Sequence, residues 1–324
     1  MLPRRSALGF MAAAAAAPAV AAEPALWAAE YRASKADVSL YIYRKRRGAP
    51  VAGEKPLPVL FLVHGSSLSS RSSFDLTVPG AGEYSLMNVF AGYGYDVWTM
   101  DFQGYGRSSA GTGNSDIRSG VENLRAALPV VLHETGQEKV HMMGESSGAL
   151  RAGAFAMAEP GRVDRLVLEA FTWTGKGSPT LGKRAEQVAF YRTHDRRPRT
   201  LEDIRSIFTR DRPGTSDPRV PDAIAAAELP FGDTVPTGTY LDMTANLPQV
   251  DPARVLSPVM IVRGQYDGIA SEEDLLEFFR RLPNPDRQFV VLAGAAHAIG
   301  LGINRAELWH AVQAFLTMPR PQQI

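Results

Sequence analysis

Residues 139–148, KVHMMGESSG, join a short apolar run to the pattern Gly144-Glu145-Ser146-Ser147-Gly148. This G-x-S-x-G pattern is typical of a buried strand that turns sharply into a helix, with the serine at the apex. Small residues are needed two positions before and after the serine, because larger side chains would collide at so tight a turn. Ser146 is therefore the candidate nucleophile.

Apolar runs and helical patterns alternate on both sides of this stretch. Residues 59–63, VLFLV, are continuously apolar, as expected of a strand that helices cover on both faces. Further strands are predicted at 95–100, 165–170, 258–262 and 288–292, and helices at 84–92, 115–135, 149–158 and 305–317. Ser115 is the expected cap of the second helix. Strands separated by helices indicate a mostly parallel, doubly wound sheet.

Two segments depart from this rhythm. Residues 38–45 alternate between apolar and polar side chains and predict an early antiparallel strand. Between about residues 171 and 251 there is no strong strand, only two plausible helices, around 185–193 and after Thr200. This stretch is too long and irregular for a simple connection, so we expect a mainly helical lid inserted over the carboxyl edge of the sheet.

The predicted lid carries two sets of side chains, each with two interpretations. Its aromatic residues could line an apolar pocket or form the lid's own small core; they are Phe171, Trp173, Phe190, Tyr191 and Phe231. Its arginines could bind an anionic substrate or form a solvated helical face; they are Arg192, Arg196, Arg197, Arg199, Arg205, Arg210 and Arg212.

Composition narrows the class of protein. The 324 residues are 45% hydrophobic and 9% aromatic, which is enough for a sizeable globular core. Lysine and arginine total 35 against 34 acidic residues, so no net field favours nucleic acid or an anionic membrane. There is no cysteine, and neither a metal-binding H-E-x-x-H pattern nor a glycine-rich phosphate loop occurs. We therefore expect neither a metal nor a cofactor.

The first 22 residues have the order of an export signal. Arg4 and Arg5 precede a short apolar, alanine-rich run, and small residues follow up to Ala22. The alternative interpretations are an alanine-rich helix of the folded domain and a membrane anchor, but the run is too short to span about 30 Å of hydrocarbon. We predict cleavage near Ala22, a mature domain from residue 23 to 324, and a periplasmic or secreted protein without a stable anchor. The paired arginines resemble a twin-arginine signal.

Three polar residues directly follow the carboxyl ends of three predicted strands: Ser146, Asp267 and His297. The carboxyl ends of parallel strands converge at one edge of a sheet, where sites form. Histidine can accept the proton of a serine hydroxyl, and an acid can orient the histidine. Asp267 could instead be a turn residue, in which case Glu169 is the substitute acid.

Several motifs together resemble the α/β-hydrolase superfamily. They are the G-x-S-x-G pattern at 144–148, His64-Gly65-Ser66, DFQGYGRS at 101–108, GQYD at 264–267 and Ala296-His297. The resemblance covers about 38–315 apart from the lid, and it implies an α/β-hydrolase fold with Ser146, Asp267 and His297 as the triad. It also implies that the backbone N–H groups of Ser66 and Ser147 stabilise the oxyanion.

The resemblance implies cleavage of a small-molecule carboxylic ester through an acyl-enzyme, without a cofactor. The same machinery serves a peptidase or amidase of the proline iminopeptidase type, a lactonase or a C–C bond hydrolase, and a binding protein could retain the fold. Haloalkane dehalogenases and epoxide hydrolases use an aspartate in place of Ser146, which argues against them. His64 is expected to hold the loop after its strand rather than to act as a base. The sequence defines no oligomeric state.

Overall fold

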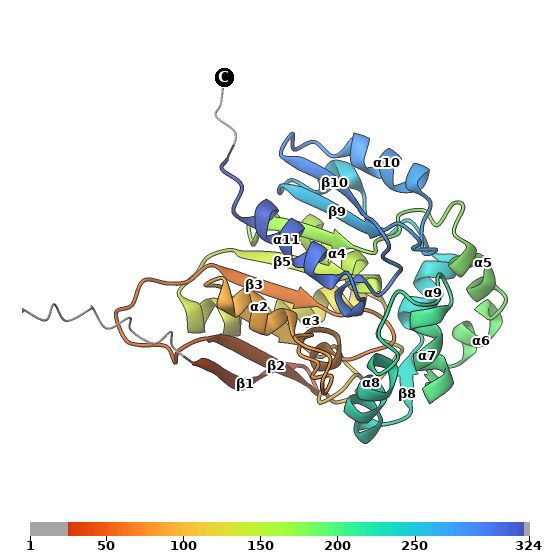
Figure 1. The fold of residues 1–324 in the computed structure, drawn as a ribbon, viewed down its shortest axis with the longest axis horizontal. Helices are drawn as coiled ribbons and strands as arrows, with labels where there is room; N and C mark the ends of the chain where they lie inside the picture. Colours follow the sequence, from red (N-terminus) through yellow and green to blue (C-terminus); the bar gives the residue numbers. More distant parts are fainter. Residues whose placement is uncertain (1–24, 321–324) are drawn as a thin grey trace, which may run out of the picture.

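The computed structural model describes residues 25–320. The predicted export signal lies outside the described residues. Eight strands form one sheet in the order β1-β2-β4-β3-β5-β6-β9-β10 (Figure 1). The strands are β1 (Leu26–Lys35), β2 (Val38–Arg47), β3 (Val59–Val63), β4 (Asp96–Met100), β5 (Val140–Glu145), β6 (Val163–Glu169), β9 (Val259–Gly264) and β10 (Arg287–Leu292). The pairs β1/β2 and β2/β4 are antiparallel and all other pairs are parallel, as predicted for a mostly parallel sheet.

Helices cover both faces of the sheet. One face packs against α3 (Ile117–Thr135), α4 (Ser147–Ala158) and α10 (Glu272–Arg281), and the other against α2 (Leu86–Gly92) and α11 (Arg305–Leu316). Phe61 of β3 packs on the first side, whereas Leu60 and Leu62 pack on the second, because successive side chains of a strand point to opposite faces. All five residues of β3 are buried, which explains its uninterrupted apolar run.

Between β6 and β9 lies an inserted segment, residues 170–258, at the end of the sheet toward which the parallel strands point (Figure 1). It contains α5 (Pro179–Ala185), α6 (Val188–Thr193), β7 (Arg196–Pro198), α7 (Leu201–Thr209), α8 (Val220–Glu228), η1 (Leu229–Phe231), β8 (Thr234–Pro236), α9 (Gly238–Ala245) and η2 (Pro252–Arg254). Ile204, Phe208 and Ile224 form a separate apolar cluster with Leu68 and Leu76, which lie in the connection between β3 and α2. This cluster fastens the inserted segment to that connection.

Three features differ from the sequence predictions. No strand was predicted before residue 38, yet β1 pairs with β2 along ten residues. Because β1 is an edge strand with mostly half-exposed or exposed residues, it lacks a strong apolar face. Within the inserted segment, α8, α9 and the small β7/β8 sheet were also missed. Finally, Asp116 and not Ser115 caps α3, since the Asp116 carboxylate accepts the Ser119 N–H at 2.7 Å.

Two shorter elements complete the fold around the site. Helix α1 (Ser70–Phe74) follows β3, and η3 (Ile299–Leu301) follows β10. In the described part of the chain, no helix has the length and apolar character needed to cross a membrane.

Candidate active site

The turn between β5 and α4 holds Ser146 at its apex. Ser146 has a φ of 57°, a conformation that a non-glycine residue keeps only where its surroundings impose it. Its N–H donates to the carbonyl of Glu169 at 2.8 Å, and its carbonyl accepts the N–H of Ala149 at 3.0 Å. A Cβ at Gly148 would collide with the carbonyl oxygen of Val63. The turn is therefore fixed by the neighbouring strands, and it requires the glycine.

Side chains from three separate loops meet at this apex. Ser146 Oγ lies 3.0 Å from His297 Nε2, and His297 Nδ1 lies 2.9 Å from Asp267 Oδ1. The three residues are 8%, 6% and 4% exposed in the order Ser146, His297 and Asp267. They follow β5, β10 and β9, so the carboxyl edge of the sheet brings them together. The arrangement is a buried, hydrogen-bonded line from hydroxyl to imidazole to carboxylate.

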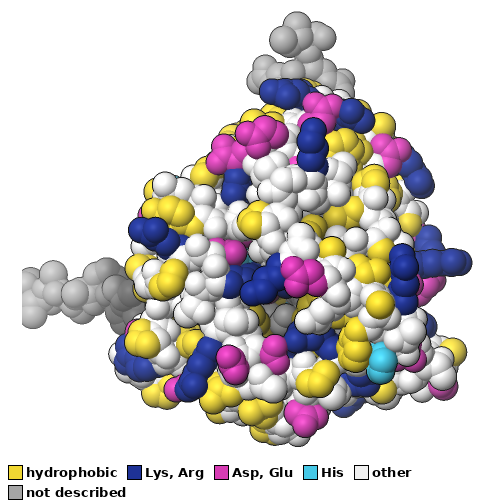
Figure 2. Space-filling view, turned by 90° about the vertical axis from the view of Figure 1, so that its right-hand side faces the viewer, with side chains coloured by type: hydrophobic (Ala, Val, Ile, Leu, Met, Phe, Trp, Pro, Cys, Tyr) yellow, Lys and Arg dark blue, Asp and Glu magenta, His cyan; other side chains and the backbone are white. Residues whose placement is uncertain are grey.

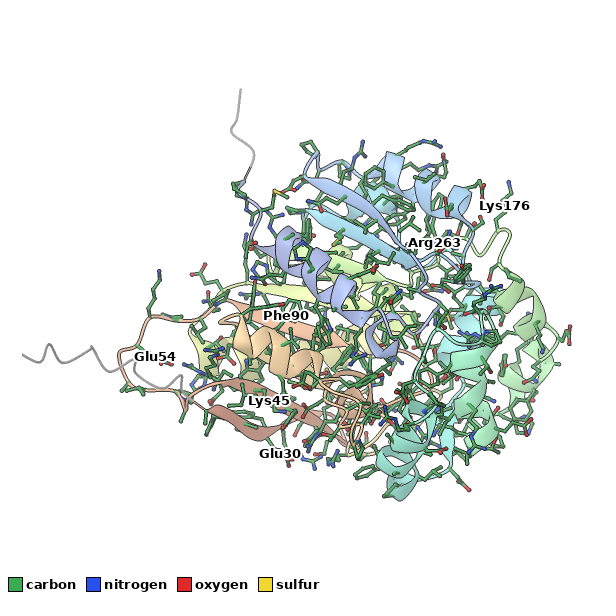
Figure 3. The ribbon with its side chains drawn as sticks, viewed as in Figure 1. Glu30, Lys45, Glu54, Phe90, Lys176 and Arg263 are labelled. Carbon is green, nitrogen blue, oxygen red and sulfur yellow. The ribbon has the colours of Figure 1, made fainter. Side chains whose placement is uncertain are left out.

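The Asp267 carboxylate is held by more than the imidazole. Its Oδ1 also accepts the Ile269 N–H at 3.0 Å, and Arg263 (labelled in Figure 3) donates from Nη2 to the Asp267 carbonyl at 2.9 Å. Burial alone would raise the pKa of Asp267, but the charge and hydrogen bond of His297 outweigh burial and lower it. Asp267 therefore stays ionised and can accept the imidazole N–H.

Two further carboxyl groups belong to the strands beneath the apex. Glu145 and Glu169 are paired in register on β5 and β6. Burial raises the pKa of Glu145 to about 7, and burial together with Glu145 raises the pKa of Glu169 well above its ordinary value. Glu169, the alternative acid, forms no hydrogen bond or ion pair with His297 among the described residues; its backbone carbonyl accepts the Ser146 N–H. Asp267 is thus the carboxylate beside the imidazole.

The two predicted oxyanion donors lie side by side. Ser147 is the first residue of α4, Ser66 follows β3, and their hydroxyls are joined by a 2.7 Å hydrogen bond. Thr239 Oγ1 donates to Ser66 Oγ at 2.8 Å, and the Tyr105 hydroxyl donates to the Ser66 carbonyl at 3.0 Å. Within residues 25–320, neither the Ser66 nor the Ser147 backbone N–H donates a hydrogen bond. Free N–H groups at a helix start favour a developing negative charge.

His64 holds the loop that carries Ser66. It is fully buried; its Nδ1 pairs with the carbonyl of Gly65 at 2.8 Å, and its Nε2 accepts the Phe102 N–H at 3.1 Å. Burial and the nearby charge of Arg151 lower the pKa of His64 to about 3, so the ring is neutral and carries its proton on Nδ1. His64 therefore links the loops after β3 and β4, and among residues 25–320 its ring forms no hydrogen bond with Ser146.

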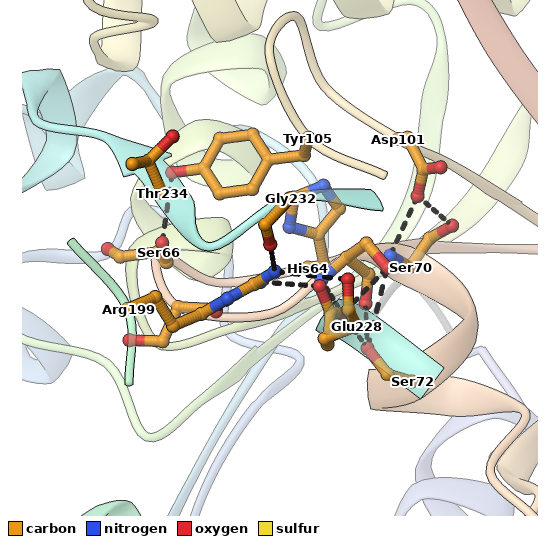
Figure 4. A network of polar contacts seen from close by, with 12 residues as sticks. His64, Ser66, Ser70, Ser72, Asp101, Tyr105, Arg199, Glu228, Gly232 and Thr234 are labelled. Carbon is orange, nitrogen blue, oxygen red and sulfur yellow. Dashed lines mark hydrogen bonds and ion pairs between the residues drawn. The ribbon is translucent and has the colours of Figure 1, made fainter. Parts of the chain in front are cut away.

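A buried ion pair of the inserted segment binds the same loop by hydrogen bonds (Figure 4). Arg199 Nη1 lies 2.5 Å from Glu228 Oε2 and also donates to the Ser67 carbonyl at 3.1 Å. Glu228 Oε1 accepts the Ser69 N–H at 2.5 Å and the hydroxyls of Ser69 and Ser72. The Arg199–Glu228 ion pair therefore fixes the inserted segment and the Ser66 loop relative to each other.

Two adjoining cavities open beside Ser146. The inner cavity, about 30 Å³, is lined by Ser146, His297, Ser66 and Glu145, together with residues of the inserted segment. The outer cavity, about 500 Å³, lies mainly among α5, α7 and their neighbours. Four residues line both cavities: Ser67, Arg184, Ile207 and Arg210. The inserted segment thus forms one wall of the approach to Ser146.

The structure separates the side chains that were grouped in the predicted lid. Of the five aromatic residues, only Tyr191 lines the outer cavity; Phe171 and Trp173 pack in the main core, and Phe231 is 40% exposed. Of the seven arginines, Arg197, Arg199 and Arg210 line the outer cavity. The others lie outside its lining, and Arg192 and Arg205 are exposed.

Sequence reasoning missed two residues of the site. Glu145 was quoted only as the variable position of G-x-S-x-G, which carries no requirement for a carboxylate. Arg184 lies in α5, where no pattern distinguishes it from the surface basic residues around it. In the described ranges, no group of three His, Cys, Asp or Glu side chains could hold a metal ion.

The fold, the strained serine turn and the serine-acid-histidine order define an α/β hydrolase. A family model described as "Serine aminopeptidase, S33" matches residues 77–301, and the chain belongs to this family of α/β hydrolases.

Similar proteins share this class but differ in activity. The chain is 35% identical over 116 residues to a 2-hydroxy-6-oxononadienedioate/2-hydroxy-6-oxononatrienedioate hydrolase of Pseudomonas putida; the match covers 36% of this chain and 38% of the relative. The 2-hydroxy-6-oxo-6-phenylhexa-2,4-dienoate hydrolase of Rhodococcus has a TM-score of 0.63 at 19% identity, with 90% of this chain and 100% of that chain covered. A thermophilic esterase from Thermogutta terrifontis has a TM-score of 0.61 at 22% identity, with 90% and 98% covered. The two structures share the fold, and the chain spans less than half of the curated relatives it matches.

Proposed function

We propose that this hydrolase is a serine hydrolase that cleaves a carboxylic ester through an acyl-enzyme. The observation that carries the proposal is the line Ser146 Oγ, His297 Nε2, His297 Nδ1, Asp267 Oδ1, with spacings of 3.0 and 2.9 Å. A serine hydroxyl is a weak nucleophile, and a general base at hydrogen-bond distance activates it. The ionised Asp267 supplies the acceptor that keeps the single N–H of the neutral imidazole on Nδ1, so that Nε2 is free to accept the serine proton.

In the proposed reaction, Ser146 Oγ attacks the ester carbonyl while His297 Nε2 takes the hydroxyl proton. The carbonyl oxygen becomes an oxyanion, and the N–H groups of Ser66 and Ser147 donate to it. Collapse of the tetrahedral intermediate breaks the bond to the alcohol, which leaves with the proton from His297. Water then attacks the acyl-enzyme with His297 again as base, which releases the acid and restores Ser146.

A second candidate is hydrolysis of a C–C bond, favoured by the names of the relatives. The Pseudomonas putida relative and the Rhodococcus structure are both named as hydrolases of 2-hydroxy-6-oxo dienoates or dienedioates. Loss of absorbance of a 2-hydroxy-6-oxo dienoate, compared with ester turnover under the same conditions, distinguishes the candidates. A kcat/KM for the dienoate above that of every ester would make C–C hydrolysis the preferred function.

An aminopeptidase or amidase activity has weaker support. Recognition of a free amine needs a carboxylate near the reacting bond. Glu145 lines the inner cavity, but burial raises its pKa to about 7 and so favours its neutral form. The outer cavity carries five basic side chains against the two acidic side chains of Asp203 and Asp211. Asp203 already pairs with Arg197 at 3.0 Å. A panel of aminoacyl amides with free and blocked amines tests this candidate, and faster turnover of the free amines would favour it.

Covalent labelling tests the proposed nucleophile. We expect a fluorophosphonate probe to label the wild-type protein and to leave Ser146→Ala unlabelled, because the probe requires an activated serine. Esters graded by acyl and alcohol size then define the preferred substrate. Equal labelling of the alanine variant, or failure of the wild type to hydrolyse any ester in the series, would reject the ester hydrolase proposal.

We also propose that the protein is exported and that residues 1–22 are removed. The basic, apolar and small-residue order of this segment supports the proposal. N-terminal sequencing of the protein from periplasmic and cytoplasmic fractions tests it. Recovery of the uncleaved chain in the cytoplasm alone would contradict export.

A further inference from the structure

We propose that the substrate carries a carboxylate, held by Arg184 and Arg210 where the outer cavity meets the inner one. This inference rests on the proposed hydrolytic function and adds a substrate class to it. Both arginines line both cavities, so a group bound between them would lie on the path to Ser146.

Arg184 is half-buried, and one nitrogen of its guanidinium is enclosed without a hydrogen-bond partner. This nitrogen is Nη1, and among residues 25–320 no acidic side chain lies within ion-pair distance of Arg184. Its guanidinium carbon lies 5.1 Å from the centre of the Tyr240 ring. A buried cation without an acid is unfavourable unless a ligand supplies the opposite charge.

The acidic residues of the cavity do not neutralise this charge. Asp203 is engaged by Arg197 and by the cap of α7. Asp211 forms an ion pair with Arg210 Nε at 3.7 Å but forms none with Arg184, and its Oδ2 has no hydrogen-bond partner in the described residues. Arg199, a further cation of the wall, is matched by Glu228. Once these ion pairs are counted, Lys183 and Arg184 remain without an acidic partner among residues 25–320, so the net charge of the cavity wall is positive.

Neighbouring groups respond to this positive charge. Burial, together with Arg210 and Arg197, lowers the pKa of Arg184 to about 10, which still leaves it charged at neutral pH. Burial would raise the pKa of Tyr240, yet the charges of Arg197 and Arg184 outweigh burial and lower it. Figure 2, which faces the inserted segment, shows lysine and arginine side chains around a hollow near the centre of this face. An anion would relieve the repulsion among these cations.

A carboxylate fits this site better than a neutral group. The planar guanidinium presents paired N–H donors that match the two oxygens of a carboxylate. The outer cavity, about 500 Å³, has room for a small acyl or alcohol chain that ends in such a group. The two arginines therefore act as specificity determinants, whereas the bond-breaking groups lie on the opposite wall.

Two esters that differ in one charge test the proposal: mono-4-nitrophenyl glutarate, and the same compound with its free carboxylate capped as a methyl ester. We expect the wild type to show a higher kcat/KM for the charged ester. Arg184→Met should lower the ratio of the two kcat/KM values by roughly 10- to 100-fold, as expected for a lost charge-assisted hydrogen bond. Arg184→Lys should recover part of the ratio, because it restores the charge without the planar fork.

Arg192→Met is the matched control, because Arg192 is an exposed arginine of the same segment outside both cavity linings. It should leave the ratio unchanged. A wild type that prefers the capped ester, or an Arg184→Met that slows both esters equally, would overturn the carboxylate site while leaving ester hydrolysis intact.

Calorimetric titration with glutarate provides a readout that needs no turnover. We expect glutarate to bind the wild type and to bind Arg184→Met at least about tenfold more weakly. This result would hold even if neither ester is hydrolysed, in which case the proposed function fails and the anion site stands. Equal binding to both proteins would reject the anion site. Unchanged melting temperatures confirm that the variants are folded.

Discussion

The two walls of the site differ in charge and in how they are built. The sheet wall carries Glu145, Glu169 and Asp267 at the ends of buried strands. The wall made by the inserted segment carries Arg184 and Arg210, together with other arginines of that segment. Apolar packing on both faces of the sheet stabilises the sheet wall. The wall of the inserted segment depends on its small apolar cluster with Leu68 and Leu76 and on ion pairs such as Arg199–Glu228.

The difference in charge matches the proposed division of roles: the bond-breaking residues lie on the sheet wall, and the arginines proposed to bind the substrate lie on the inserted segment. On the sheet wall, burial and the neighbouring Glu145 raise the pKa of Glu169, whereas the pKa of Asp267, beside His297, is lowered. On the other wall Arg184, whose pKa is about 10, remains charged at neutral pH, so the field across the cavity favours an anion. We therefore expect a change at Asp267 to act on kcat, changes at the buried carboxyl groups beneath it to act on stability, and changes on the inserted segment to act on selectivity or on stability.

The largest effect is expected from Asp267→Asn, which should lower kcat by roughly 10⁴-fold. The amide would hold the imidazole in the wrong tautomer while the fold stays intact. Steady-state kinetics on the best ester measure the loss. Glu169→Gln is the matched control on the same wall, with an expected change of less than about tenfold. If the two variants lost activity equally, Asp267 would not be the distinctive acid.

The second largest effect is expected from Glu228→Gln, which tests how strongly the buried ion pair holds the inserted segment against the Ser66 loop. The substitution leaves Arg199 buried without its counter-charge and weakens the bonds to Ser69 and Ser72. We expect a loss of about 3 kcal/mol in the free energy of unfolding, measured by urea denaturation. The double variant with Arg199→Met should lose less than the sum of the single changes. Strict additivity would show that the pair is not coupled.

Glu145→Gln should stabilise the protein at alkaline pH. The folded pKa of Glu145, about 7, lies above its ordinary value, so burial favours the protonated form. Stability from this group is therefore fully present below about pH 4.5 and is lost as the pH rises through 7. We expect the variant to exceed the wild type by on the order of 2 kcal/mol at pH 8, and the difference to vanish near pH 4.5. A difference independent of pH, or one equal to that of the exposed Glu186→Gln, would contradict this.

The smallest effect is expected from Asp222→Asn. Asp222 and Arg205 join α8 to α7 at 2.9 Å, but both side chains are more than half exposed. Solvent screens such a pair, so the free energy of unfolding should change by less than about 1 kcal/mol. This pair is the exposed counterpart of the buried Arg199–Glu228 ion pair. A loss as large as that of Glu228→Gln would mean that burial does not distinguish them.

The sheet could be predicted because its signals are local. Residues 59–63 were predicted as a strand with the same bounds that the structure has, since full burial on both faces leaves a continuous apolar run. The strand-end positions of Ser146, Asp267 and His297 followed from the same pattern, and the three side chains lie in hydrogen-bond contact. Their catalytic roles remain a prediction.

The inserted segment could not be predicted to the same depth, because its contacts are distant in sequence. Glu228 accepts a hydrogen bond from Ser69, which is 159 positions away in the sequence, and no local sequence pattern predicts that contact. Arg184 and Arg192 are both basic residues on short helices, yet one lines the cavities and the other is exposed. Both α5 and α6 pack against α9, so the helix alone does not distinguish the two arginines; the side on which each side chain lies does.

The hydrogen bonds that Ser69 and Ser72 donate to Glu228 also limit which changes this enzyme can accept, in the laboratory or during evolution. The inserted segment cannot be replaced on its own, because residues of that segment hydrogen-bond to the loop that carries Ser66 and help to fix its conformation. A graft from another hydrolase would need to bring partners for Ser66, Ser67, Ser69 and Ser72, or replace that loop at the same time. The segment proposed to select the substrate and the loop proposed to supply an oxyanion donor would therefore change together during evolution.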